Sequence, residues 1–80
     1  MDYQTYRITC DRSIAEELIE ELRKDESASL NIDESTKDLS GIEVLTIIAN
    51  LTTIGSSLLT VWLAARPHLK ERVKIDKAEE

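Results

Sequence analysis

The stretch Val44–Ala65, which reads VLTIIANLTTIGSSLLTVWLAA, governs the expected fold because its 22 positions contain no charged residue. A helix of that length reaches across the hydrocarbon core of a membrane. Ser40 and Glu43 fit a capping box at its start. Pro67 ends it, because the residue before a proline is driven out of the α region. The pattern predicts one long uncharged helix over residues 40–66.

The residues on either side of this run predict strands and one further helix. Apolar residues at helical spacing, opened by a second capping box at Ser13–Glu16, predict an amphipathic helix over residues 13–25. Alternation with a period of two predicts strands over residues 3–10, 27–33 and 69–76. The expected fold is a small α+β module in the order β-α-β-α-β, with a three-stranded sheet and two helices on one face.

Small polar residues recur through the uncharged run at spacings of three and four, which places them on one stripe of a helix. These residues are Thr46, Asn50, Thr53, Ser57 and Thr60. Such side chains let helices approach closely and form hydrogen bonds across their interface. We therefore expect the stripe to pack against a second copy or another partner. A core helix with a partly exposed polar side and a membrane span are the alternatives.

The membrane alternative makes its own prediction. A span over Val44–Ala65 would place the C-terminus in the cytoplasm, because the cations lie on that side. A sheet whose strands lie on both sides of the run cannot be divided by a bilayer, so the two interpretations exclude each other. We favour the sheet. Gly55, in the middle of the run, is expected to mark close packing against the sheet or the first helix.

Composition narrows the classes of function. The 80 residues are expected to form a single domain, residues 1–80. Sixteen acids against ten Lys and Arg leave a net charge of −6, which argues against a general nucleic-acid binder. One cysteine and one histidine cannot form a disulfide framework or a structural zinc site. No motif places a nucleophile beside a base, so we expect no enzyme activity, no cofactor and no metal, and Cys10 is expected to be a buried inert thiol.

Charge is segregated along the chain. Residues 11–38 hold ten acids and four bases, whereas residues 66–77 hold five bases and two acids. The basic segment is expected to dock against an acidic surface, within the chain or on a partner. We expect Arg66, Arg72 and Lys74 to be electrostatic docking points and Trp62 to be an apolar anchor, because large apolar residues and arginine dominate interface energetics.

Three stretches carry a resemblance to a known family: Ile54–Leu59, then Val61–Leu63 with Arg66, then Arg72–Ile75. Together with the order of the predicted elements they resemble the effector-associated constant component family of bacterial conflict systems. The resemblance implies a small cytoplasmic accessory protein without catalytic residues. Members of that family are encoded beside proteases, caspase-like or other effectors and NTP-dependent regulators.

The favoured function is a non-enzymatic interaction or adaptor module of a prokaryotic effector or immune system. Its expected partners are a second copy of the chain, an effector such as a protease or caspase-like enzyme, or both. One alternative is a small single-span membrane protein using Val44–Ala65. Another is a small acidic inhibitor, for which Glu16, Glu17, Glu20 and Glu21 supply a run of carboxylates.

Overall fold

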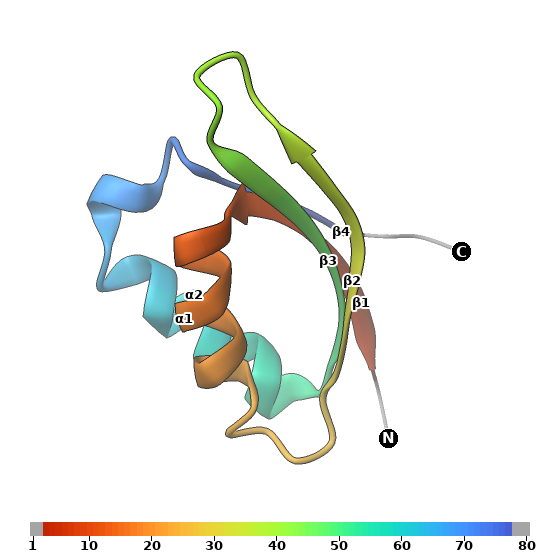
Figure 1. Ribbon diagram of the computed structural model, residues 1–80. Helices are drawn as coiled ribbons and strands as arrows, with labels where there is room; N and C mark the ends of the chain where they lie inside the picture. The colour runs from red at the N-terminus through yellow and green to blue at the C-terminus, as the bar shows by residue number, and fades with distance from the viewer. Residues whose placement is uncertain (1–2, 78–80) are drawn as a thin grey trace.

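A computed structural model describes residues 3–77 and contains four strands and two helices in that range, with one short 3-10 turn (Figure 1). In chain order the elements are β1 (Gln4–Asp11), α1 (Arg12–Leu22), β2 (Ser29–Lys37), β3 (Glu43–Leu51), α2 (Thr53–Ala64), the 3-10 turn η1 (Pro67–Leu69) and β4 (Val73–Lys77). The α+β class is confirmed. The predicted three-stranded sheet is wrong, because a strand stands where the first part of the long helix was expected.

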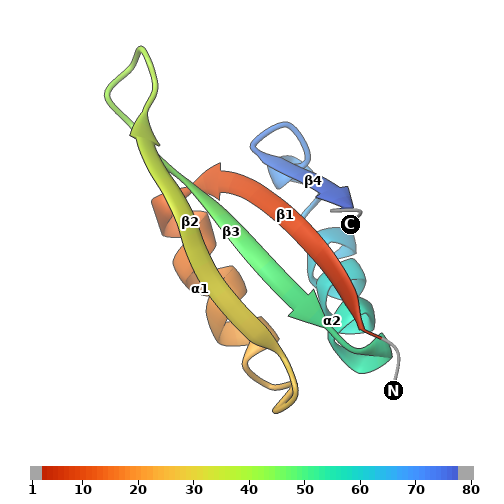
Figure 2. The ribbon, with the colours of Figure 1, turned by 90° about the vertical axis from the view of Figure 1, so that its right-hand side faces the viewer.

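The four strands form one sheet in the order β2-β3-β1-β4, and each neighbouring pair is antiparallel. Both helices lie against one face of this sheet, as predicted, and no element of residues 3–77 covers the other face (Figures 1 and 2). The β-α-β-β-α-β order is that of the ferredoxin-like, or split β-α-β, domains.

The expected helix over residues 40–66 is wrong, because the run is divided between a strand and a helix of 12 residues. In β3 every second residue, from Leu45 to Leu51, is buried under the helices, which is the period of a strand. This strand pairs on both sides, and a central strand has no need of charged side chains. Thr52 then caps α2, because its side chain accepts a hydrogen bond from the backbone N–H of Gly55.

The same division overturns the single-span alternative, which needed an unbroken helix over Val44–Ala65. Of the helices in the described part of the chain, none combines the length and the apolar character that a bilayer crossing requires. The uncharged run is instead accounted for by one buried strand and one short helix packed on the sheet.

The predicted capping box at Ser40–Glu43 is part of the β2–β3 hairpin. Asp38 Oδ1 accepts hydrogen bonds from the backbone N–H groups of Ser40, at 2.8 Å, and Ile42, at 3.0 Å. Gly41 adopts a positive φ of 81°, which an L side chain rarely adopts. Because this turn follows Asp38, the second strand continues to Lys37 instead of ending at residue 33 as predicted.

The remaining predicted boundaries shift by a few residues. The first helix begins at Arg12 and ends at Leu22, not at residues 13 and 25, and Asp11 rather than Ser13 is its N-cap residue. The last strand begins at Val73, because η1 occupies residues 67–69 where the strand was expected to start.

The core lies between the two helices and the sheet. Its buried residues are Ile8, Cys10, Ile14, Ala15, Leu18, Leu22, Leu45, Ile47, Ala49, Leu51, Leu59 and Trp62. Cys10 is 1% exposed, as the alternation of β1 predicted. Burial, with a smaller contribution from the charge of Asp11, raises the pKa of the Cys10 thiol to about 11, so the reactive thiolate is disfavoured in the folded chain.

Candidate interaction surfaces

The polar stripe expected on one helix is divided between two surfaces. Thr46 and Asn50 belong to β3 and lie on the face of the sheet that no helix covers, since they alternate with Leu45, Ile47 and Ala49, which face the core. Thr53, Ser57 and Thr60 lie on α2, where all three are exposed. The five residues therefore do not form one continuous surface.

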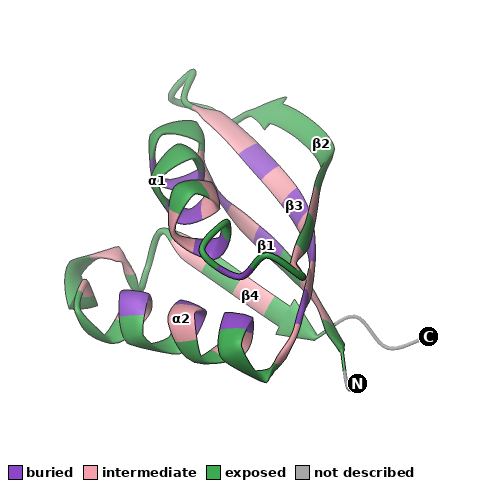
Figure 3. Cartoon of the chain, turned by 90° about the horizontal axis from the view of Figure 1, so that it is seen from below, coloured by how far each residue is buried: buried purple, intermediate pink, exposed green. Residues whose placement is uncertain are grey.

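The exposed side of α2 is uncharged and partly apolar. We call it the α2 outer face and define it as Thr53, Ile54, Ser57, Thr60 and Val61. The side chains of Ile54 and Val61 are 68% and 67% exposed. Figure 3 shows that buried residues occupy only narrow bands of this helix. The sequence prediction included the three polar members but missed the two aliphatic ones, although seven residues separate Ile54 from Val61, which is two helical turns.

On the uncovered face of the sheet two pairs of polar side chains lie side by side. The Oγ1 atoms of Thr9 and Thr46 are 3.5 Å apart, and Thr5 Oγ1 donates to Asn50 Oδ1 at 3.3 Å. All four residues are half-buried. Lys74 lies opposite Thr9 in the sheet and is exposed. Thr46 and Asn50 thus form hydrogen bonds within the sheet. Among the expected interaction residues on this face, Lys74 is the one whose side chain is accessible to another protein.

Trp62 and Arg66 form one unit at the end of α2. Trp62 is 3% exposed and belongs to the core, so its indole is not presented at the surface of this structure. The guanidinium carbon of Arg66 lies 4.7 Å from the centre of the Trp62 ring, and Arg66 Nη1 donates to the Trp62 carbonyl at 3.3 Å. Such a cation–π contact holds the arginine against the fold.

Arg72, a third expected docking point, is also engaged within the chain. Its guanidinium donates to both carboxylate oxygens of Asp11, with distances between 2.8 and 3.0 Å. The hydrogen bonds to Asp11 raise the pKa of Arg72 further. This pair links the end of β1 to the residue before β4, so the attraction predicted between the acidic and basic segments is present inside the molecule.

The close packing expected at Gly55 is confirmed, and its main neighbour is the buried Asp25. Thr52 Oγ1 donates to Asp25 Oδ2 at 2.7 Å, and the Ser27 N–H donates to Oδ1 at 3.1 Å. These bonds, that from Thr52 above all, lower the pKa of Asp25. A Cβ atom at Gly55 would lie 2.5 Å from Asp25 Oδ2 and 3.1 Å from the Cβ of Leu51. We call Asp25, Thr52 and Gly55 the Asp25 latch.

The outer side of α1 is acidic, as expected for a solvated helix face. Glu16, Glu17 and Glu20 are exposed, while Glu21 is half-buried and pairs with Lys24 at 3.1 Å. Within residues 3–77 no three side chains of His, Cys, Asp or Glu are grouped as they would be around a metal ion.

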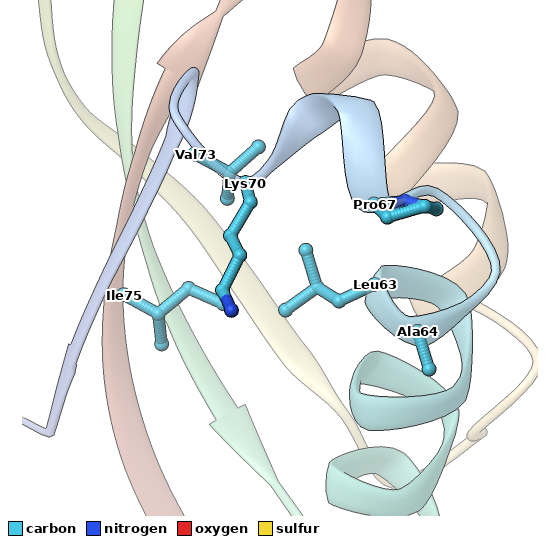
Figure 4. Close-up of a pocket in the computed structure, with 6 residues that line it drawn as sticks. All are labelled: Leu63, Ala64, Pro67, Lys70, Val73 and Ile75. Atoms are coloured by element: carbon cyan, nitrogen blue, oxygen red, sulfur yellow. The ribbon is translucent and has the colours of Figure 1, made fainter.

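A groove that the sequence did not predict lies between the end of α2 and β4 (Figure 4). It has a volume of about 330 Å³. Apart from Lys70 its walls are apolar, and the residues that line it are Leu63, Ala64, Pro67, Lys70, Val73 and Ile75. We call it the β4 groove. It forms where α2, η1 and β4 pack together, so no local pattern indicates it.

These features define a small ferredoxin-like α+β protein that presents an uncharged helix face and an apolar groove. No protein-family model matches the chain, and no curated protein matches it. Among solved structures it is similar to one described as "De novo designed protein Foldit4", with a TM-score of 0.61 and 14% sequence identity. The match covers 98% of this chain and 96% of that one. At this identity the likeness concerns the fold alone.

Proposed function

We propose that this chain is a non-enzymatic interaction module that serves as an accessory or adaptor component of a prokaryotic effector system in the cytoplasm. Its contact surface for the effector, a protease or caspase-like enzyme, is the α2 outer face. The observation that supports this proposal is the exposure of Ile54 and Val61, about two thirds each, on a helix side without charge.

The two aliphatic side chains of the α2 outer face are exposed to water. Fully burying an aliphatic side chain contributes roughly 1.5–3 kcal/mol, and that gain is unused while Ile54 and Val61 face water. The centre of a protein interface is depleted of charged residues, and the α2 outer face has this composition. On α1, by contrast, the outward positions carry glutamates that are well solvated. The outer side of α1 is therefore suited to water, whereas the α2 outer face is suited to an apolar protein surface.

The resemblance to the effector-associated constant component family supports the choice of partner. The stretches Ile54–Leu59 and Val61–Leu63, which carry much of that resemblance, form α2, and Arg72–Ile75 leads into β4. The family's implied role beside an effector is compatible with a small domain that offers one uncharged helix face.

A binding measurement with the effector encoded beside the gene tests the proposal. We expect the wild-type chain to bind the purified effector in titration calorimetry. The double variant Ile54→Glu, Val61→Glu should bind at least about tenfold more weakly, which corresponds to about 1.4 kcal/mol, because two carboxylates would be buried in an apolar contact.

The matched control introduces the same two changes on another exposed part of the chain. Leu39 and Ile42 are exposed aliphatic residues of the β2–β3 hairpin, and the double variant Leu39→Glu, Ile42→Glu should bind as the wild type does. The proposal is contradicted if the effector does not bind the wild-type chain, or if the α2 double variant and the hairpin double variant bind equally well.

A second candidate function is a small acidic inhibitor, and the exposed carboxylates of α1 favour it. Glu16, Glu17 and Glu20 present three negative charges on one short helix, which could stand in for a polyanion in the cleft of a basic enzyme. The double variant Glu16→Lys, Glu20→Lys separates the two functions. An inhibitor would lose its target, whereas the module proposed above would keep its effector.

A further inference from the structure

The directions of the two edge strands allow the sheet of one copy to continue into the sheet of another. β2 and β4 are the outermost strands, and within residues 3–77 neither has a partner on its outer side. Because every neighbouring pair is antiparallel, the two edge strands run in opposite directions. A second copy in the same orientation, placed with its β2 beside β4, therefore continues the antiparallel sheet and keeps all helices on one face.

The two edges also carry opposite charge. The turn before β2 and the strand itself, residues 26–37, contain three acids and one base. The approach to β4 and the strand itself, residues 70–77, contain four bases and two acids. Like charges on edge strands oppose pairing, so two β4 edges repel each other, as do two β2 edges. The arrangement that brings opposite charges together is β4 beside β2.

The two edges also carry apolar side chains on the same side of the sheet. Ile32 of β2 is 59% exposed, although it lies opposite the buried Ile47 and so on the helix-covered side of the sheet. Val73 and Ile75 of β4 are on that same side, because they lie opposite the buried Cys10 and Ile8. They form one wall of the β4 groove (Figure 4). Extending the sheet brings Ile32 of the second copy to this groove.

From these three matches we propose that the chain self-associates head to tail by pairing β4 of one copy with β2 of the next, with Ile32 inserted into the β4 groove. This deepens the proposed function, since it assigns self-association to the sheet edges and leaves the α2 outer face for the effector. The interface is heterologous, so association continues beyond two copies until a ring closes or a filament forms. The bulge between Ile32 and Glu34 restricts the regular pairing to a short segment.

Two single variants, each blocking one edge, provide the test. Ile32→Asp removes the inserted side chain and places a carboxylate at the groove, and Ala64→Arg fills the groove from an exposed position of α2. Leu39→Asp is the matched control, because it makes the same kind of change at a fully exposed hairpin residue. Molar mass is measured by light scattering from about 10 µM to about 1 mM, since small interfaces associate weakly.

The expected outcome is a mass that rises with concentration for the wild type and for Leu39→Asp, and a monomer for either edge variant alone. A mixture of Ile32→Asp with Ala64→Arg retains one intact junction, so it should form a dimer and nothing larger. A wild type that stays monomeric up to about 1 mM overturns the inference. A two-fold dimer through β4 also overturns it, since Ile32→Asp would then remain dimeric. Neither result affects the calorimetric test of effector binding.

Discussion

Cys10 shows most clearly how a single residue of this chain responds to burial. Its thiol lies in the core, and burial raises its pKa to about 11 from an ordinary value of 9.0. Between these two values the unfolded chain loses the thiol proton while the folded chain keeps it. The free energy of unfolding that depends on this proton is therefore fully present below about pH 9 and is lost progressively as the pH rises toward 11.

We predict that the wild-type chain loses stability above pH 9 more steeply than Cys10→Ala does. The difference in slope should be at most about 1.4 kcal/mol per pH unit. Urea unfolding at several pH values between 8 and 11 measures it, and the alanine variant serves as the reference that lacks only the thiol. Parallel pH profiles for the two proteins would show that the thiol does not titrate differently in the folded state.

At the scale of elements, the prediction succeeded where a single period ran the length of the element. β1 and α1 lie within a few residues of their expected positions, because alternation and helical spacing of apolar residues are unambiguous there. The last strand was also expected, except that η1 shortens it. These elements could be assigned from local pattern alone.

The division of Val44–Ala65 could not be predicted from charge, because neither the part of β3 within this run nor α2 contains a charged residue. The signal that separates them is the period. Leu45, Ile47 and Ala49 alternate with half-buried residues, whereas α2 buries Gly55, Leu59 and Trp62 at helical spacing. Small polar residues happen to follow spacings of three and four across the boundary, which made the run resemble one helix.

The Asp25 latch predicts how the substitution Gly55→Ala changes the free energy of unfolding. Helix propensity alone favours Gly55→Ala by about 1 kcal/mol. The structure predicts the opposite sign, a net destabilisation of about 1–2 kcal/mol, because the new Cβ would overlap Asp25 Oδ2 and crowd Leu51. Urea unfolding measures the change.

Ser57→Ala is the control for this variant, because it changes an exposed residue of the same helix and should alter stability by no more than about 0.5 kcal/mol. In an Asp25→Ala background the cost of Gly55→Ala should be smaller, since the nearest oxygen is absent. A Gly55→Ala protein that is more stable than the wild type would contradict the packing described for the latch.

At the scale of the whole molecule, the candidate surfaces combine residues that no local pattern connects. The expected polar stripe contributes three residues to the α2 outer face. The two aliphatic residues of that face, Ile54 and Val61, can be assigned to it only once the buried side of the helix is known. The β4 groove requires α2, η1 and β4 to pack together. Two of the expected docking arginines stabilise the fold through Trp62 and Asp11. Sequence therefore indicates which segments are unusual, and tertiary packing determines which of their residues face a partner.

The central claim is that the α2 outer face binds the effector, and amide chemical-shift mapping tests it most directly. A purified effector of the proposed class, a protease or caspase-like enzyme, would be added to the 15N-labelled chain. We predict that the largest shifts fall on the α2 outer face, from Thr53 to Val61, and that α1 is little affected. Shifts concentrated on Glu16, Glu17 and Glu20, or no shifts at all, would contradict the claim.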